Sequence, residues 1–383
     1  MLQDPLNLSR IREWKHDLPH SSVILSEKEN LYETNPTLGL AAAINRERAE
    51  LADLVQGRIK TLQNPDNCAK AKKLVCTVDK ICGFGCIVHH IAYCLITGYH
   101  TNRTVILKLK VLYDAKSWNE TFLPLSSTCL DGSGESYGVW GGGGNNVSAQ
   151  VISVGTFSVM KNYKKAPWAA LRPTIMPKEL ESRLRNISND LLIWWVGQFV
   201  TYAMRLAPKM EKFVGEERAR MRKGIPHNDS SIIAIGLHVR RTDKLIKEAS
   251  YYPLKAYLSH VTRYLRVREK NDGKPISGHI FLASDEPKVV EEARKLEKKT
   301  NKWKLHANET IAKDATNVKH RFKSGKLGIL IDVMLLADCE FVVCTFSSNV
   351  CRLVAELKEA EKELGEEVVS VDDPYDCLFM GRT

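Results

Sequence analysis

The spacing of apolar residues predicts both helices and strands in the first half of the chain. Between residues 30 and 61, apolar positions recur every three or four residues with charges between them, as on a helix with one solvated face. Two β-branched runs, at 103–109 and 151–154, predict strands. The longest apolar run, at 191–204, predicts a core helix, and a charged helix is expected at 209–223.

After residue 225 the pattern changes to short apolar strands that alternate with amphipathic helices. The strands are expected at 231–239, 278–284 and 340–346, and the helices at 252–270, 287–299, 326–337 and 349–364. This alternation predicts a parallel, doubly wound sheet, a fold that binds ligands at the carboxyl ends of its strands. We therefore expect an α/β protein with a helical segment over 1–61, a cysteine-rich open-sheet domain over 62–225 and a Rossmann-like domain over 226–383.

The composition is that of an ordinary globular protein, with 44% hydrophobic and 26% charged residues. The net charge of +11 favours an anionic partner, and nucleic acid, an acidic membrane surface or a phosphorylated ligand would all satisfy it. No apolar run reaches the roughly 20 residues of a membrane-spanning helix, and no signal peptide opens the sequence. A luminal protein would need a targeting segment ahead of this sequence.

The cysteines indicate an oxidising compartment. Six of the ten lie between Cys68 and Cys129, which is typical of a disulfide framework or of a metal site. Structural zinc usually takes close C-x-x-C pairs, and the close pair here, Cys82 and Cys86, is separated by three residues, so disulfides are favoured. Seven N-x-S/T sequons also favour the secretory pathway: Asn7, Asn102, Asn119, Asn146, Asn186, Asn228 and Asn308.

Polar and charged residues follow the strands of the predicted sheet. The three strand ends read HVRRTDK at 238–244, ASDEP at 283–287 and CTFSSN at 344–349. The last runs straight into a helix, whose N-terminal N–H groups and dipole favour an anion, so its serines and asparagine are placed to cradle a phosphate. These residues are Ser347, Ser348 and Asn349. Arg240 or Arg241 could clamp the same anion, so this edge is predicted to hold a diphosphate.

Taken singly, each of these residues has an ordinary structural explanation. An arginine pair after a strand is usually a solvated loop, a Ser-Ser pair before a helix is usually an N-cap, and Asp332 by default lies on an exposed helix edge. Their coincidence on one predicted face favours a binding site.

The sequence lacks the motifs of several nucleotide-binding classes. It has no GxGxxG after a strand, no GxxxxGK[ST] and no DxD triplet, and the glycine-rich segment at 139–146 is interpreted as a surface loop because it does not lie between a strand and a helix. A metal-free nucleotide-sugar transferase with two Rossmann-like domains fits what remains.

Four motifs resemble those of the eukaryotic α-1,6-fucosyltransferases that modify the core of N-glycans. They are HVRRTDK, FLASDEP, LVCTVDKICGFGC followed by HH, and FVVCTFSSNVCR. The resemblance covers about residues 54–373. It implies a GT-B-like fold and a Golgi type II membrane enzyme that uses GDP-fucose without a metal or other cofactor. Relatives continue into a Src-homology-3-like domain that is absent from this sequence.

The resemblance also implies roles for individual residues. His238 and Asp332 would contact guanine, and Tyr113 would meet the ribose. The other donor-binding residues would be Gly83, Arg240, Arg321, Ser348 and Asn349, the last in place of a glutamine, and Arg241 stays the alternative clamp. The acidic pair that helps to bind the acceptor would be Asp372 and Asp373.

A carboxylate is expected to take the proton of the acceptor hydroxyl, which is a weak nucleophile. The resemblance assigns this general base to Glu248. The supporting catalytic residues would be Lys244, Asp243 and Arg240. Asp285 and Glu286 are the competing carboxylates and could instead orient the sugar or the HVRRTDK loop.

The family's disulfides would pair Cys68 with Cys129, Cys76 with Cys94, Cys82 with Cys86, and Cys344 with Cys351. Cys339 and Cys377 would stay unpaired.

The expected activity is inverting transfer of fucose from GDP-fucose to the 6-hydroxyl of the innermost GlcNAc of N-glycans, in the Golgi lumen. The expected partners are the donor, N-glycans on glycoproteins and a second copy in a homodimer, with no nucleic acid and with a membrane only through an anchor. Two alternatives stay open: a GDP-fucose transferase for chitin-like oligosaccharides or protein hydroxyls, and an inactive GDP- or glycan-binding relative.

Overall fold

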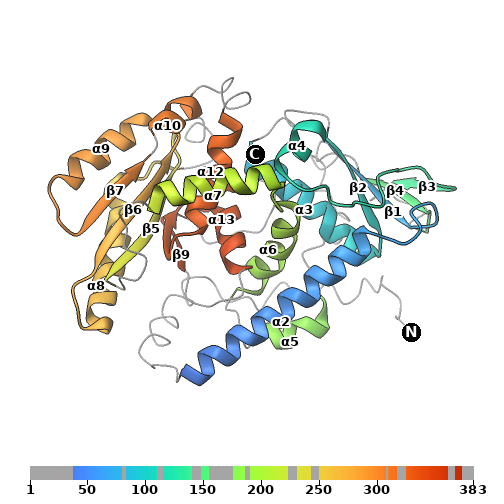
Figure 1. The fold of residues 1–383 in the computed structure, drawn as a ribbon, viewed down its shortest axis with the longest axis horizontal. Coiled ribbons are helices and arrows are strands. Elements are labelled where there is room, and N and C mark those ends of the chain that lie inside the picture. Colours follow the sequence, from blue (N-terminus) through green and yellow to red (C-terminus); the bar gives the residue numbers. More distant parts are fainter. Residues whose placement is uncertain are drawn as a thin grey trace. The chain divides into compact units, whose positions relative to one another are not determined.

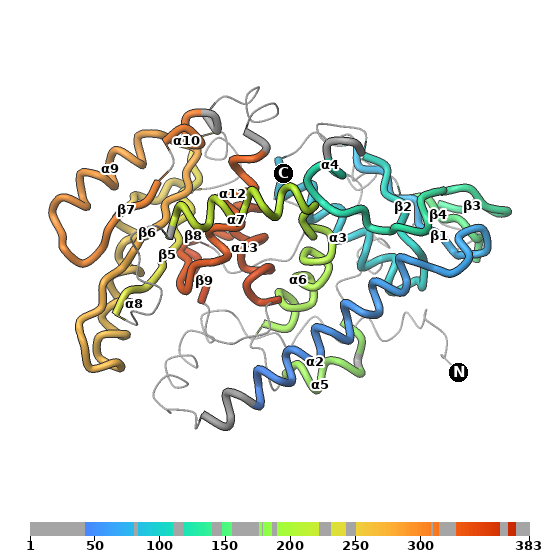
Figure 2. Tube along the Cα trace, viewed as in Figure 1, coloured from blue at the N-terminus to red at the C-terminus, as the bar shows by residue number. Residues whose placement is uncertain are grey.

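The computed structural model describes residues 38–79, 83–109, 115–139, 148–154, 176–185, 190–222, 231–242, 250–307, 309–316, 325–360 and 367–372. The chain forms two compact units, one of residues 1–207 with 360–364 and one of residues 208–359 with 365–383. Figure 1 shows their elements, and Figure 2 follows the same trace.

The unit boundaries differ from the expected domains. The helix α2 (Leu38–Gln63) belongs to the first unit because its apolar side chains, such as Leu51 and Val55, are fully buried there. The charged helix α7 (Pro208–Arg222) belongs to the second unit, where Arg218 makes two hydrogen bonds of 2.6 and 2.8 Å to Asp338. The boundary between the two α/β parts therefore falls at residue 207 and not at 225.

The first unit is built around a small parallel sheet. Its elements after α2 are β1 (Lys73–Val78), α3 (Phe84–Thr101), β2 (Thr104–Leu109), α4 (Ala115–Thr121), β3 (Tyr137–Val139), β4 (Val151–Val154), α5 (Lys178–Leu184) and α6 (Leu191–Ala203). The strand order is β2-β1-β4-β3, and every pairing is parallel. The parallel pairing confirms the α/β class for this part of the chain.

The predicted core helix is present as α6. Trp194, Trp195 and Phe199 are fully buried, and Tyr99 of α3 meets Trp195 edge-on with 5.4 Å between ring centroids. Asp190 is the N-cap of the helix, and its carboxylate accepts a hydrogen bond from the N–H of Ile193. The buried aromatic side chains stabilise this helix, which is too short to span a membrane.

Three of the expected disulfides are present. They join Cys68 to Cys129, Cys76 to Cys94, and Cys344 to Cys351. Cys86 is also disulfide-bonded, while Cys82 and Cys377 lie outside the described residues. Cys339 keeps its thiol, which donates to the carbonyl of Leu335.

The second unit is the doubly wound part. Its elements after α7 are β5 (Ile232–Val239), α8 (Leu254–Asp272), β6 (Ser277–Ser284), α9 (Pro287–Glu297), β7 (Trp303–Ala307), α10 (Glu309–Thr316), α12 (Gly325–Ala337), β8 (Phe341–Cys344), α13 (Asn349–Glu359) and β9 (Glu367–Ser370). The strand order is β7-β6-β5-β8-β9, and all pairings are parallel. Figure 2 labels all five strands. The expected parallel sheet is confirmed, with β7 and β9 as additional edge strands.

Helices cover both faces of this sheet. On one face, Ile235 and Leu237 of β5 pack in a core with Tyr257 of α8 and Val290 of α9. On the other face α12 comes so close that a Cβ on Gly236 would lie 2.9 Å from the side chain of Leu336. Only glycine allows this approach, which fixes α12 against the strand.

No helix in the described ranges is both long and apolar enough to cross a membrane. Nor do the described residues contain a group of three or more His, Cys, Asp or Glu side chains placed to hold a metal ion.

Candidate active site

Four loops lie at the carboxyl edge of the second unit's sheet because its strands are parallel. Residues 240–242 follow β5, 285–286 follow β6, 345–348 follow β8 and 371–372 follow β9. Hydrogen bonds join the first loop to the second and the third to the fourth. The structure therefore gathers the predicted strand-end residues at one edge.

Asp285 holds the loop that follows β5. Its carboxylate lies 2.5 Å from the guanidinium of Arg240 and accepts the backbone N–H of Arg241 at 2.8 Å. It also accepts the hydroxyl of Thr242, a residue with a positive φ of 31°. Both carboxylate oxygens are thus occupied, an arrangement that suits a group positioning Arg240 better than one taking a proton from a substrate.

The two arginines of this loop differ in their surroundings. The side chain of Arg241 is 8% exposed, contacts Glu286 at 3.4 Å and lies over the ring of Tyr251 at 4.6 Å. The side chain of Arg240 is 17% exposed and is held by its contact with Asp285. Of the two arginines that the sequence left open, Arg240 is the better placed to meet a ligand.

His238 is buried one residue before the end of β5. It is 5% exposed, and within the described chain its Nδ1 has no hydrogen-bond partner. Burial, with a smaller contribution from the charge of Arg240, lowers the pKa of His238 to about 4. The imidazole is therefore neutral at pH 7, with a ring nitrogen left for a ligand.

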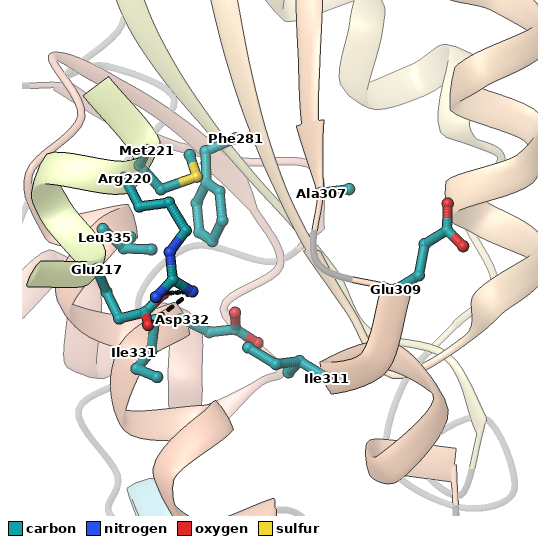
Figure 3. Close-up of a pocket in the computed structure, with 10 residues that line it drawn as sticks. All are labelled: Glu217, Arg220, Met221, Phe281, Ala307, Glu309, Ile311, Ile331, Asp332 and Leu335. Carbon is teal, nitrogen blue, oxygen red and sulfur yellow. Dashed lines mark hydrogen bonds and ion pairs between the residues drawn. The ribbon is translucent and has the colours of Figure 1, made fainter. Parts of the chain in front are cut away.

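Asp332 lies in the middle of α12 and lines a pocket of about 340 Å³ (Figure 3). The residue is 6% exposed and makes no hydrogen bond or ion pair within the described residues. Burial raises the pKa of its carboxyl to about 8. The default expectation of an exposed helix edge is wrong here, because α12 is covered by the sheet on one side and contacts α7 and α13 elsewhere.

The rest of the pocket wall is mainly apolar and was not predicted as a site. The lining includes Phe281 of β6, Ile311 of α10 and an ion pair between Glu217 and Arg220 of α7, whose atoms are 2.9 Å apart; all four residues are labelled in Figure 3. The charges of α7 are indistinguishable by sequence pattern from those of a solvated helix, and the structure shows that one end of this helix borders the pocket.

The turn from β8 into α13 carries the predicted phosphate cradle. Ser348 is buried, and the buried hydroxyl of Ser347 has no partner in the described part of the chain. The Cys344–Cys351 disulfide joins the strand to the helix across this turn. Asn349 begins the helix, and its side-chain oxygen accepts a hydrogen bond from Arg352.

Asp372 has a contact that the sequence did not predict. Its carboxylate accepts the backbone N–H of Phe346 at 2.7 Å and that of Ser347 at 3.3 Å, and it accepts the hydroxyl of Ser370 at 2.7 Å. The N–H of Ser347 is therefore directed at a carboxylate and not at the expected phosphate position. Asp372 shapes the cradle from the adjoining strand end.

Several predicted site residues lie outside the described residues: Tyr113, Asp243, Lys244, Glu248, Arg321 and Asp373. Residues 140–147 of the glycine-rich segment also lie outside the described residues. Gly83 is described and belongs to the first unit, where it is the exposed N-cap of α3 and accepts the N–H of Ile87.

Comparisons with known proteins agree on one family. The family model described as the alpha-(1,6)-fucosyltransferase N- and catalytic domains matches residues 8–376. An alpha-(1,6)-fucosyltransferase of Drosophila melanogaster is 35% identical over 360 residues, covering 93% of this chain and 54% of the relative. One of Caenorhabditis elegans is 32% identical over 386 residues, covering 96% of this chain and 66% of the relative. The chain thus spans between about half and two thirds of the length of these relatives.

Solved structures also overlap with the chain. The NodZ alpha-1,6-fucosyltransferase soaked with GDP-fucose gives a TM-score of 0.37 at 16% identity, over 75% of this chain and 92% of that one. A point mutant of Arabidopsis thaliana FUT1 in complex with GDP gives a TM-score of 0.45 at 11% identity, over 94% of this chain and 81% of that one. At these values the fold assignment rests on the two parallel sheets themselves. From the match of its family model over residues 8–376, the chain belongs to the alpha-(1,6)-fucosyltransferase family.

Proposed function

We propose that this protein is an inverting α-1,6-fucosyltransferase that moves fucose from GDP-fucose to the 6-hydroxyl of the innermost GlcNAc of N-glycans. The family match supports the reaction class. The single structural observation that carries the donor assignment is Asp332, a buried carboxyl without a partner among the described residues, at the wall of a pocket of about 340 Å³.

The pocket suits a guanine base. A carboxylate can accept two parallel hydrogen bonds from the N1–H and the 2-amino group of guanine, which repays the burial of its charge. With a pKa of about 8, Asp332 is mostly protonated at pH 7 in the empty pocket. Binding of guanine then favours the ionised form, so one proton leaves as the donor binds. The apolar side chains of Phe281 and Ile311 would contact the faces of the base.

The neighbouring loops suit the diphosphate. Arg240 brings a guanidinium held by Asp285, and the N-terminus of α13 brings a positive dipole end with the free hydroxyl of Ser347. These groups would stabilise the negative charge that develops on the departing GDP. We propose on this basis that departure of GDP needs no metal ion.

The chemistry at the acceptor follows from the family resemblance. Glu248 would take the proton of the acceptor hydroxyl as the new bond to the anomeric carbon forms and the bond to GDP breaks, with Lys244 nearby. Direct displacement of this kind inverts the anomeric configuration. The three disulfides support a location in an oxidising compartment, for which we propose the Golgi lumen.

The proposal is tested by calorimetry with GDP together with a turnover assay using GDP-fucose and a GlcNAc-terminated biantennary N-glycan. We expect micromolar or tighter GDP binding and release of GDP that depends on the glycan. Binding of GDP without turnover would favour the inactive relative, and turnover only with chitin-like oligosaccharides or with protein hydroxyls would favour another fucosyltransferase.

A further inference from the structure

An apolar pocket of about 90 Å³ lies at the edge of the first unit's sheet, whereas the candidate donor site belongs to the second unit. It lies beside β2, one of the two edge strands of that sheet. Its apolar lining includes Val105, Leu107, Leu109, Trp118, Leu125 and Leu130. Leu130 is 71% exposed. The pocket therefore leaves apolar surface open to solvent, which an apolar group placed over it could cover.

One polar residue of the pocket wall is an acceptor for modification. Asn119 lines the pocket, its side chain is exposed, and with Glu120 and Thr121 it forms the N-x-T sequon of a glycosylation site. The neighbouring Trp118 is buried against Phe122, with 4.5 Å between ring centroids. This packing holds α4, the helix that carries Asn119, against the core. An exposed asparagine thus sits at the mouth of an apolar cavity.

We infer that Asn119 carries an N-linked glycan whose first N-acetylglucosamine covers this pocket. In the modification, the Nδ2 of Asn119 forms a bond to C1 of the sugar while the bond from C1 to a lipid-linked diphosphate breaks. The amide loses one proton and the lipid diphosphate leaves. The co-reactant is therefore a lipid-diphosphate-linked oligosaccharide, used by the glycosylation machinery of the secretory pathway.

The chemistry of the first sugar fits the cavity. Its acetamido group is attached to C2, the carbon next to the linked C1, so the acetamido methyl stays close to Asn119. A cavity of about 90 Å³ has room for such a small substituent and not for a whole sugar ring. The apolar face of the ring can then lie over Leu130, whose exposed surface has no other described cover. The inference rests on passage through the secretory pathway and not on transferase activity.

The chain offers a matched control for this site. Asn102 is the other sequon residue in the described ranges, and it too is exposed, but it is not part of the pocket wall. It ends α3 in a left-handed conformation with a φ of 52°, which aspartate also tolerates. Asn102→Asp and Asn119→Asp therefore each remove one sequon with the same change of side chain.

The test compares the two variants in protein secreted from insect cells. Glycopeptide mass spectrometry should find Asn119 occupied in the wild type. Loss of the glycan in Asn119→Asp should lower Tm by about 2–4 °C, the shift expected for re-exposing a contact of roughly one methylene group in a domain of this size. Asn102→Asp should leave Tm unchanged.

Two further arms isolate the sugar from the side chain. Trimming the wild-type glycan to its first N-acetylglucosamine should keep the wild-type Tm, because that sugar makes the contact. In protein from a bacterial host that does not glycosylate, Asn119→Asp should leave Tm unchanged. An unoccupied Asn119 would overturn the modification site, and a drop of Tm on trimming, or the same drop in bacterial protein, would overturn the covering role. Turnover of GDP-fucose should be unaffected in every arm, so failure here is distinguishable from failure of the proposed function.

Discussion

Replacing Asp332 with asparagine tests the residue that recognises the nucleotide base in this account. The folded state holds the pKa of this carboxyl at about 8, against an ordinary value of 3.8. The folded protein thus binds the proton more tightly than the unfolded chain does. The stabilisation that comes from this proton is fully present below pH 3.8 and is lost as the pH rises to about 8.

The magnitude follows from this difference. Each pH unit in the window changes the free energy of unfolding by about 1.4 kcal/mol. Between pH 5 and pH 8 the wild type should therefore lose up to about 4 kcal/mol that Asp332→Asn does not lose, because an amide does not titrate. Thermal unfolding across this range measures the effect. A wild type and variant with parallel pH profiles would show that the carboxyl does not titrate in the window.

Nucleotide binding by the same variant tests recognition. The carboxylate can accept from both N1–H and the 2-amino group of GDP, whereas IDP lacks the amino group. A bidentate contact with a base is worth about 1–3 kcal/mol of discrimination, so the wild type should prefer GDP to IDP by about 10- to 100-fold. Asp332→Asn should lose this preference, because its amide nitrogen faces a donor. Glu309→Gln, which changes an exposed carboxylate of the same pocket, is the control and should keep it.

Calorimetry completes this test. If GDP favours the ionised form of Asp332, binding to the wild type at pH 7 should release close to one proton, seen as a dependence of the heat on the buffer's ionisation enthalpy. The variant should release none. A variant that binds GDP as tightly as the wild type and still prefers it to IDP would refute the contact between Asp332 and the base.

Four further changes test the rest of the site. Arg240→Ala should cost about 2–5 kcal/mol of transition-state binding and nearly abolish turnover with the fold intact, and wild-type activity would overturn its assignment to the diphosphate. Asp285→Asn should weaken the clamp on Arg240 and lower kcat/KM while circular dichroism stays unchanged, whereas unchanged kinetics would remove its positioning role. Glu248→Gln should lower kcat by about 10²-fold or more and leave GDP affinity nearly unchanged, so normal turnover would exclude it as the base. Activity should survive EDTA, and a loss restored by manganese or magnesium would contradict the proposed metal-free leaving-group stabilisation.

Much of the second unit could be predicted because its elements have strong local patterns. Apolar residues recur about every two residues in β5 and about every 3.6 residues in α8. Once the strands are parallel, their carboxyl ends must lie at the same edge of the sheet. The edge strand β7 was missed because WKLHA alternates apolar and polar residues too briefly to stand out. The apolar helix α3 was missed for another reason, since it is buried over most of its length and has few polar residues to mark a solvated face.

Most details of the site could not be predicted because they depend on contacts between distant segments. The expected alternative that Asp285 orients the HVRRTDK loop is confirmed, although the sequence did not indicate which atoms of that loop it would bind. Asp285 joins the loop after β6 to that after β5, and Asp372 joins the loop after β9 to that after β8. Neither hydrogen bond can be inferred from the spacing of residues within one segment. The burial of Asp332 likewise depends on packing around α12 that no periodicity within the helix encodes.

The most direct test of the proposed function is mass spectrometry of a biantennary N-glycan with terminal GlcNAc after incubation with the protein and GDP-fucose. We predict a gain of one fucose on the innermost GlcNAc, linked to its 6-hydroxyl, and no gain when Arg240→Ala is used. Fucose on an antennal GlcNAc, or GDP binding with no fucose on any sugar of the glycan, would contradict it.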